Sequence, residues 1–284
     1  MIQKSKNIPQ TASERWRFTP AFFINLLVGL LIASPVIYCL SISFMPEHEI
    51  IAYPPRFFTL NPTLENYFSA LRQVPIPKFL LNSLFVSVCI TLIQITTSSL
   101  AAYGFVFFDF KGKKVLFMLV LSTMMIPGEA ILISNYLTIS SLGLLDSYAG
   151  LIIPFMATAM GIFQIRQFYL TVPRELKEAS IIDGCSDLKF FSHILFPISM
   201  PAVSALAVYV FIGSWNQYMW PLLITNTPAK RTVQIGISML QFSDGLSNGT
   251  VCAGCMLILI PSILIFLLGQ QRMVGGITAG AVKG

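Results

Sequence analysis

The sequence has very little charge for its length. Asp, Glu, Lys and Arg make up 11% of its 284 residues, whereas hydrophobic residues make up 55%. Soluble globular domains carry about 25% charged residues, so this composition excludes an ordinary soluble protein. Gly and Pro, with 18 and 17 residues, are not in the excess that marks fibrous or disordered chains. The composition therefore indicates an integral membrane protein.

Groups that carry out catalysis or bind metals are also scarce. There are two histidines, His48 and His193, and neither stands beside a second His or a Cys. Cys252 and Cys255 form a C-x-x-C pair without a second ligand pair, so close helix packing explains them better. No Ser/His/Asp set and no paired intramembrane carboxylates can be assembled. These absences argue against an enzyme and predict that this chain binds no metal and no cofactor.

Long apolar runs dominate what is present. Each is near the roughly 20 residues that a helix needs to cross the hydrocarbon core of a membrane. Helices are the expected form, because backbone groups in lipid must pair within their own segment. The runs are 21–44, 79–107, 115–139, 148–170, 201–225 and 251–269. The sequence therefore predicts an all-α protein with six transmembrane helices.

The distribution of Lys and Arg predicts the orientation of these helices. With the N-terminus inside, 13 of the 18 basic residues lie on or near the cytoplasmic side. The net charge of +6 then reflects topology, and no soluble basic face for nucleic acid is present. We expect both termini inside: a cytoplasmic segment 1–20, a six-helix domain 21–271 with a cytoplasmic loop 171–200, and a cytoplasmic tail 272–284.

The loop 171–200 concentrates charged residues in an otherwise apolar chain. Pro173 stands where a helix could begin, and Leu176, Ala179 and Ile182 follow at spacings of three, on one side of a short helix. Gly184 can adopt the left-handed conformation of a helix end. The sequence therefore predicts a helix that is followed by a glycine turn.

A second helix is predicted after that turn. Ser186 or Asp187 can cap it, and Leu188, Phe191 and Leu195 recur at helical spacing on one face. Two interpretations of this helix pair remain open. It is either an amphipathic hairpin on the lipid headgroups or a surface on which a partner docks.

The stretch EASIIDGCSDLKFFSHILFP resembles the EAA loop of ABC importer permeases. The family pattern is Glu-Ala-Ala, three residues, Gly, nine residues, Ile, one residue and Leu-Pro. The residues in register are Glu178, Ala179, Gly184, Ile194 and Pro197. Ser180 replaces the second Ala, and Phe196 stands where Leu is usual. The stretches LDSYAGLIIPFMATAMGIFQIRQFYLTVPRELKEASIIDG and SWNQYMWPLLIT extend the resemblance to carbohydrate-type permeases, particularly the second permease of glycerol-3-phosphate and oligosaccharide importers.

This resemblance implies the type I ABC importer permease fold and an ATP-driven importer of a sugar or sugar-like solute in the bacterial inner membrane. In that family the subunit works with a second homologous permease, two cytoplasmic ATPase subunits and an extracytoplasmic solute-binding protein. Since the sequence lacks a G-x-x-x-x-G-K-[ST] motif, ATP and Mg²⁺ are expected on the partner ATPase. The expected ATPase-coupling residues are Glu178, Ala179, Asp183, Gly184, Leu188, Phe191, Ile194 and Pro197. A secondary transporter or a membrane scaffold without an ATPase partner is the alternative.

Glu129 is the first candidate for a translocation pathway. It is expected about 14 residues into the third helix, roughly 21 Å from the cytoplasmic end at 1.5 Å per residue. A charge at that depth is costly, which favours a role in the pathway. The alternatives are a hydrogen bond to the backbone that Pro127 leaves unpaired, or a position close enough to the outer surface to be in water.

A polar and aromatic cluster in the fifth helix is the second candidate. Trp215, Asn216, Gln217 and Tyr218 combine aromatic faces with amide donors, which suits sugar rings. An aromatic belt at the membrane interface is the alternative. Asn82 is a weaker candidate for the pathway, because it could equally join neighbouring helices.

Overall fold

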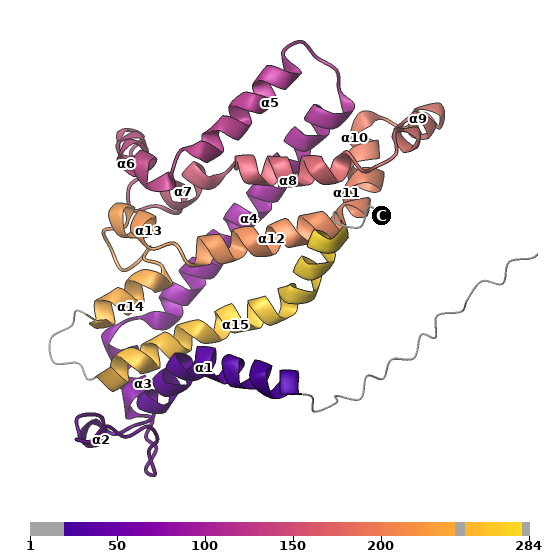
Figure 1. The fold of residues 1–284 in the computed structure, drawn as a ribbon. Coiled ribbons are helices and arrows are strands. Elements are labelled where there is room, and N and C mark those ends of the chain that lie inside the picture. The colour runs from indigo at the N-terminus through magenta and orange to yellow at the C-terminus, as the bar shows by residue number, and fades with distance from the viewer. Residues whose placement is uncertain (1–19, 242–247, 280–284) are drawn as a thin grey trace, which may run out of the picture.

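The computed structural model describes residues 20–241 and 248–279, and all regular structure in these ranges is helical (Figure 1). The all-α prediction is therefore confirmed. Most of the predicted segment 1–20 and the end of the predicted tail 272–284 lie outside the described residues. The longest helices are α1 (Pro20–Ser43), α4 (Ile76–Phe107), α12 (Met200–Trp215) and α15 (Asn248–Ala279).

α4 is the central helix. It packs against α8 (Ala159–Tyr169) and α12, while α15 lies between α12 and α1 (Figure 1). Half of the apolar window of α4 is buried, whereas none of the corresponding window of α1 is. α4 and α8 approach closely at Gly161, where a Cβ would stand 2.5 Å from the Oγ of Ser98. Small residues thus allow a close helix contact in the core.

The third predicted run is not one continuous helix. It forms α5 (Lys113–Ser122) and α6 (Leu132–Ser141), and the two halves meet at an angle of 94°. Two short 3₁₀ turns, Thr123–Met125 and Gly128–Ile131, lie between them. Pro127 has no N–H with which to continue the helix, which explains the break.

The fourth and fifth runs are broken as well. α7 (Tyr148–Ile152) continues through a 3₁₀ turn that contains Pro154, and then bends by 49° into α8. The fifth run ends as α12 at Trp215 and resumes as α13 (Met219–Ile224). Continuous transmembrane helices were therefore the wrong expectation for these runs.

Short helices occupy the connections. In chain order they are α2 (Glu47–Ile50), α3 (Glu65–Gln73), α9 (Arg174–Ile182), α10 (Asp187–Phe190), α11 (Phe196–Ile198) and α14 (Val233–Gln241). α9, α10 and α11 separate α8 from α12, whereas α14 lies between α13 and α15.

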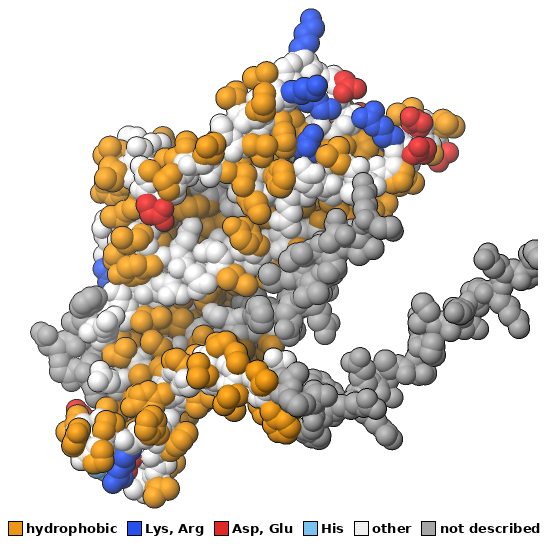
Figure 2. Space-filling model, viewed as in Figure 1, with side chains coloured by type: hydrophobic (Ala, Val, Ile, Leu, Met, Phe, Trp, Pro, Cys, Tyr) orange, Lys and Arg blue, Asp and Glu red, His pale blue; other side chains and the backbone are white. Residues whose placement is uncertain are grey.

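The bundle has two different ends (Figure 1). The α9 end carries α9, α10 and the last turn of α4, and the α13 end carries α13, α14 and the loop between α6 and α7. Charged side chains gather at the α9 end, and apolar side chains cover much of the visible flank (Figure 2). This flank is the kind of surface that contacts lipid.

Two apolar clusters hold the bundle together. The larger joins α4, α8, α10 and α12, and it includes the fully buried Tyr169, Phe190 and Leu195. The smaller lies toward the α13 end and includes Phe79 and Trp215. Full burial of one such side chain contributes roughly 1.5–3 kcal/mol.

The number of membrane spans stays a prediction. Within residues 20–241 and 248–279, Phe22–Ser43 and Ile76–Phe107 are long and apolar enough to cross a membrane by themselves. Three bent helix pairs raise the number to as many as five, if each pair is one span. The apolar segment Asn248–Leu264 of α15 is shorter than these candidate spans. The structure therefore supports membrane helices without fixing six of them.

Candidate functional site

The predicted helix and glycine turn in the 171–200 loop are present. α9 follows Pro173, whose backbone is extended, and Gly184 has a φ of +72° in the left-handed region. The Gly184 N–H donates to the carbonyl of Ile181 at 3.0 Å, and the Cys185 N–H donates to that of Ser180 at 2.8 Å. These bonds satisfy carbonyls at the end of α9 and reverse the chain.

The second helix also forms, with Ser186 as its cap. The Ser186 Oγ accepts a hydrogen bond from the Lys189 N–H at 3.4 Å. α10 then passes into a π-helical turn, Phe191–Leu195, whose wider spacing shifts the register. Leu188, which precedes this turn, is 71% exposed, whereas Leu195, at its end, is fully buried. The prediction that Leu188, Phe191 and Leu195 share one face is wrong.

Phe190, which the sequence analysis missed, is the inward anchor of this helix. It is fully buried, and its ring centre lies 5.6 Å from that of Phe107 on α4. Phe191 is half-buried and lies 5.4 Å from the ring of Tyr103, and Ile194 is half-buried beside the same cluster. Phe191 and Ile194 therefore contact the protein's own core.

The other predicted coupling residues are exposed. They are Glu178, Ala179, Asp183, Gly184, Leu188 and Pro197. Exposed apolar side chains accompany them, and we call Leu176, Ile181, Ile182 and Leu188 the α9–α10 apolar surface. Ile182, at 86% exposure, is its most open member. An uncovered apolar surface among charged residues is typical of a contact site for another protein or for a membrane surface.

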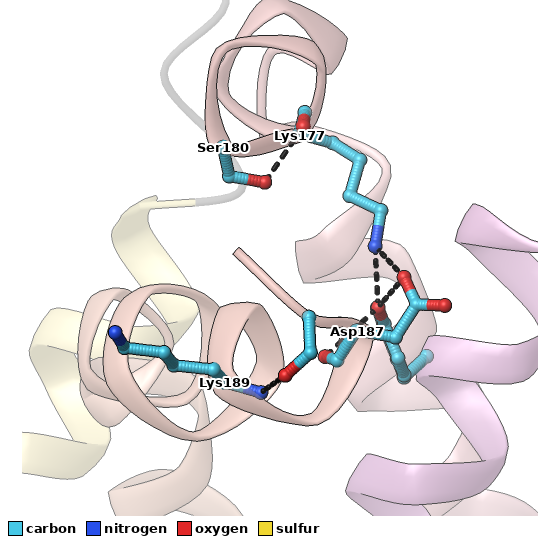
Figure 3. Close-up of polar contacts among 6 residues, drawn as sticks. Lys177, Ser180, Asp187 and Lys189 are labelled. Atoms are coloured by element: carbon cyan, nitrogen blue, oxygen red, sulfur yellow. Dashed lines mark hydrogen bonds and ion pairs between the residues drawn. The ribbon is translucent and has the colours of Figure 1, made fainter. Parts of the chain in front are cut away.

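Lys177, on the inward side of α9, connects three elements. Its Nζ donates hydrogen bonds to the Tyr103 hydroxyl of α4 at 2.8 Å and to the Asp187 carboxylate of α10 (Figure 3). The Tyr103 hydroxyl donates in turn to the carbonyl oxygen of Asp187 at 3.3 Å. The Lys177 side chain is 14% exposed, and that of Asp187 is 58% exposed. We call Lys177, Tyr103 and Asp187 the Lys177 clasp.

Aromatic rings surround the Lys177 ammonium. Its Nζ lies 4.7 Å from the ring centre of Phe190, 5.4 Å from that of Tyr103 and 5.9 Å from that of Phe108. Such distances allow cation–π attraction in addition to the hydrogen bonds. Sequence reasoning missed the clasp. The opposite charges of Lys177 and Asp187, on either side of the Gly184 turn, could have predicted their ion pair. No feature of the sequence predicts the contact with Tyr103.

A cavity of about 150 Å³ lies beside the clasp, between the end of α4 and α9. Its lining residues are Val106, Phe107, Asp109, Arg174, Lys177 and Glu178. Atoms that line a void forgo the dispersion contacts of a packed interface. Lys177 therefore bridges α9 and α4 at a junction that is incompletely packed on this side.

Asn82 lies at the α13 end and is 5% exposed. Its Nδ2 donates to the carbonyl oxygens of Ala229 at 3.0 Å and Arg231 at 2.9 Å, and its Oδ1 accepts from the Tyr148 hydroxyl at 2.8 Å. Both ends of the amide are thus bonded to neighbouring segments. These contacts match the alternative role, that of joining segments, and not that of lining an open pathway.

Asp146 makes a second set of polar contacts at this end. Its Oδ1 accepts the N–H groups of Asn226 and Thr227, both at 3.1 Å, and its Oδ2 accepts the Thr227 hydroxyl at 2.7 Å. The Asp146 N–H donates to the carbonyl of Ile224 at 2.8 Å. Hydrogen bonds from the hydroxyl and backbone of Thr227 hold the pKa of the Asp146 carboxyl below its usual 3.8. We call Asp146, Asn226 and Thr227 the Asp146 clasp.

Trp215, a predicted pathway residue, lies in the smaller apolar cluster. It is 3% exposed, and its ring stacks on that of Phe211 with centres 5.8 Å apart. Phe79 and Leu240 belong to the same cluster. This position favours a structural role for the indole ring.

The neighbouring polar residues lie at the break between α12 and α13, and not within one helix. Asn216 is exposed, and its Oδ1 accepts from the Nε2 of Gln234 on α14 at 3.4 Å. Gln217 and Tyr218 are half-buried, and the Tyr218 hydroxyl is 3.1 Å from the Oγ of Ser238. A helix break with amide side chains can present hydrogen bonds to a polar solute.

Glu129 is exposed in the 3₁₀ turn Gly128–Ile131, at the bend between α5 and α6. The expectation that it lies deep inside a continuous helix is wrong, because the helix breaks at Pro127. Its role in a pathway stays a prediction.

Comparisons with known proteins agree with this arrangement. The profile of the family described as "Binding-protein-dependent transport system inner membrane component" matches residues 94–274. The chain is 36% identical over 264 residues to the sn-glycerol-3-phosphate transport system permease protein UgpE of Rhizobium meliloti (strain 1021), covering 89% of this chain and 94% of that protein. It is 34% identical over 207 residues to the arabinooligosaccharides transport system permease protein AraQ of Bacillus subtilis (strain 168), covering 73% and 74%.

A solved structure shares the fold. A chain of a bacterial ABC transporter involved in the import of the acidic polysaccharide alginate superposes with a TM-score of 0.80 at 20% sequence identity. The match covers 88% of this chain and 95% of that chain. The helical arrangement is therefore that of an ABC importer permease.

Proposed function

The chain belongs to the family of binding-protein-dependent transport system inner membrane components, and we propose that its cargo is a sugar or sugar-like solute. It is a permease subunit of an ATP-driven ABC importer and not an enzyme, and ATP hydrolysis takes place on a separate subunit. The similarity to permeases for sn-glycerol-3-phosphate and for arabinooligosaccharides supports the solute class. Glycerol-3-phosphate and oligosaccharides are therefore the first solutes to test.

The proposed topology has six spans with both termini in the cytoplasm. The spans are α1, α4, α5 with α6, α7 with α8, α12 with α13, and α15. The bias of Lys and Arg supports this orientation, which places the α9 end in the cytoplasm and the α13 end outside. The domain bounds 1–20, 21–271 and 272–284 follow from this topology.

The α9–α10 apolar surface is the proposed docking site for a cytoplasmic ATPase. The observation that carries this proposal is the exposure of Ile182 and Leu188 on either side of the left-handed Gly184 turn. Burial of each side chain against a partner would contribute roughly 1.5–3 kcal/mol. Glu178 and Asp183 stand beside these residues as exposed carboxylates that can pair with basic groups of the partner.

The complete importer contains a second, homologous permease, two ATPase subunits and an extracytoplasmic solute-binding protein, with membrane lipid around the helices. ATP and Mg²⁺ bind to the ATPase subunits. Their closure moves the docked loops and turns the paired permeases from an inward-facing to an outward-facing state. Solute released by the binding protein then enters the pathway.

Leu188→Asp tests the docking proposal. The variant should insert normally, but the amount of ATPase that co-purifies with it should fall about tenfold or more, because a charge replaces a buried apolar contact. Leu142→Asp is the matched control, because Leu142 is an exposed leucine that follows α6.

Gly184→Val should have a similar effect, because the left-handed turn is strained by a β-branched residue. Normal co-purification and normal uptake in both variants would refute the docking proposal.

A further inference from the structure

We propose that Lys177 is a positioning residue that ties the docking helix α9 to α4, so that a displacement of α9 by a docked ATPase reaches the membrane helices. The proposal rests on the proposed function, because it assumes that the α9–α10 apolar surface carries the ATPase. It adds a named physical link between that surface and the bundle.

The first observation is that α9 has few other links to the bundle. Leu176, Ile181 and Ile182 are exposed, and the cavity beside α9 leaves its inner side loosely packed. Ser180 is buried, but its hydroxyl donates to the Lys177 carbonyl of its own helix at 2.7 Å. In the part of the chain that the structure describes, the polar contacts of α9 side chains with other helices are those of Lys177.

The second observation is that the Lys177 ammonium joins three elements at one atom. Tyr103 belongs to α4, which packs against α8 and α12, and Asp187 is the first residue of α10. A movement of α9 that α4 did not follow would break the bond to the Tyr103 hydroxyl. It would also withdraw the ammonium from the rings of Tyr103 and Phe190. The clasp therefore resists independent motion of α9.

The third observation is that water can reach the Asp187 end of the link. More than half of the Asp187 side chain is exposed, so water can replace Lys177 as its partner. The four-carbon stem of lysine lets the ammonium follow a shifting partner over several ångströms. A contact of this kind can be remade in each transport cycle.

The test uses the complete importer, reconstituted with the partner permease, the ATPase and the solute-loaded binding protein. Lys177→Met keeps the apolar stem and removes the charge and the donors. We expect the ATPase to co-purify in normal amount, while stimulation of ATP hydrolysis by the loaded binding protein falls about fivefold or more. Lys177→Arg keeps a cation and its donors and should retain most of the stimulation. Lys114→Met, at an exposed lysine of α5 at the same end, is the matched control and should behave as wild type.

A double-variant cycle tests whether Lys177 and Asp187 act together as one link or affect the stimulation independently of each other. If Lys177 and Asp187 act as one link, Asp187→Asn should reduce stimulation, and the double variant should be no worse than Lys177→Met. Multiplicative losses in the double variant would contradict a single link.

Two results would overturn the proposal. One is normal stimulation and uptake by Lys177→Met, and the other is loss of the ATPase from that variant, because Lys177 would then belong to the docking surface itself. Failure of the docking proposal gives a different result: the Leu188→Asp complex would keep its ATPase and its normal stimulation.

Discussion

The two ends of the bundle are held together by different chemistry. At the α13 end, the Asp146 clasp and Asn82 bind mostly to backbone N–H and carbonyl groups, through side chains with few rotatable bonds. At the α9 end, one long lysine side chain joins three helices beside a cavity. Short contacts to the backbone fix a loop in one position, whereas the long lysine side chain can keep its bonds to α4 and α10 while these helices shift together.

The two ends should therefore have different roles: the contacts at the α13 end stabilise the folded permease, whereas the Lys177 clasp couples α9 to the bundle. Damage to the α13 end should reduce the amount and stability of folded permease, and transport should fall in proportion. Damage to the Lys177 clasp should reduce transport per folded molecule. The comparison can therefore be tested by measuring thermal stability and uptake on the same variants.

Gly150→Val should have the largest effect on folding. A Cβ at Gly150 would stand 2.3 Å from the carbonyl oxygen of Leu144, and the carbonyl of Gly150 accepts from the Trp220 Nε1 at 3.2 Å. Because the clash is with backbone, we expect destabilisation of more than about 3 kcal/mol and little monodisperse protein in detergent.

Gly213→Val is the matched control for this substitution, because nothing lies within 4 Å of a Cβ there. Equal yields and equal melting temperatures for the two variants would show that the α13 end is not rigid, and the comparison of the two ends would then be wrong.

Asn82→Ala should have the next largest effect. It removes three hydrogen bonds and leaves the carbonyls of Ala229 and Arg231 and the hydroxyl of Tyr148 without this partner. We expect a loss of about 2–4 kcal/mol in stability, measured by thermal unfolding of the purified permease. Asn61→Ala, at an exposed position, should change little.

The same variant distinguishes the two roles considered for Asn82. A structural residue lowers uptake in proportion to the folded permease that remains. A pathway residue would instead lower uptake per folded molecule without a change in unfolding temperature, and that result would restore Asn82 to the translocation pathway.

Asp146→Ala should have a smaller effect that depends on pH. Removal of the carboxylate should cost about 1–2 kcal/mol at neutral pH. The pKa of Asp146 is lower in the folded protein than its usual 3.8, so its contribution is fully present above pH 3.8 and is lost as the pH falls through the lower, folded value. The difference in melting temperature between wild type and variant should be constant from neutral pH to about pH 5 and shrink below the usual pKa.

Glu65→Ala, at an exposed carboxylate of α3, is the control and should show no comparable difference. A wild-type advantage that persisted at the lowest pH would mean that the protonated Asp146 side chain holds the loop equally well, contrary to a clasp based on charge.

Features that depend on neighbouring residues could be predicted from the sequence. The Gly184 turn and the Ser186 cap follow from the preferences of a few adjacent residues, and both are present. The apolar runs predicted helices, since hydrophobic length is itself local. The match of residues 94–274 to the family then confirmed the kind of protein.

Features that depend on distant residues could not be predicted. Lys177 and Tyr103 are 74 positions apart, and Asn82 and Arg231 are 149 apart. A pattern of hydropathy says nothing about such partners. The π-helical turn between Leu188 and Leu195 and the break that moves Glu129 out of a helix are local, but apolar periodicity assumes a regular helix and cannot detect them.

Asn216→Ala should have the smallest effect on stability and separates folding from transport at the α13 end. Asn216 is exposed at the break after α12, and its contact in the described structure is the long hydrogen bond from Gln234. We expect a change of less than about 0.5 kcal/mol in stability, as for other exposed side chains. If the amide donates to the hydroxyl groups of a passing solute, its removal should lower uptake about two- to tenfold, the value of one hydrogen bond.

Uptake at rising solute concentration and thermal unfolding should be measured on the same preparation, with Gln234→Ala as the control that removes the Asn216 contact but keeps its amide. Wild-type uptake by Asn216→Ala over the whole concentration range would remove it from the pathway. Equal losses in both variants would assign the effect to the contact between α12 and α14.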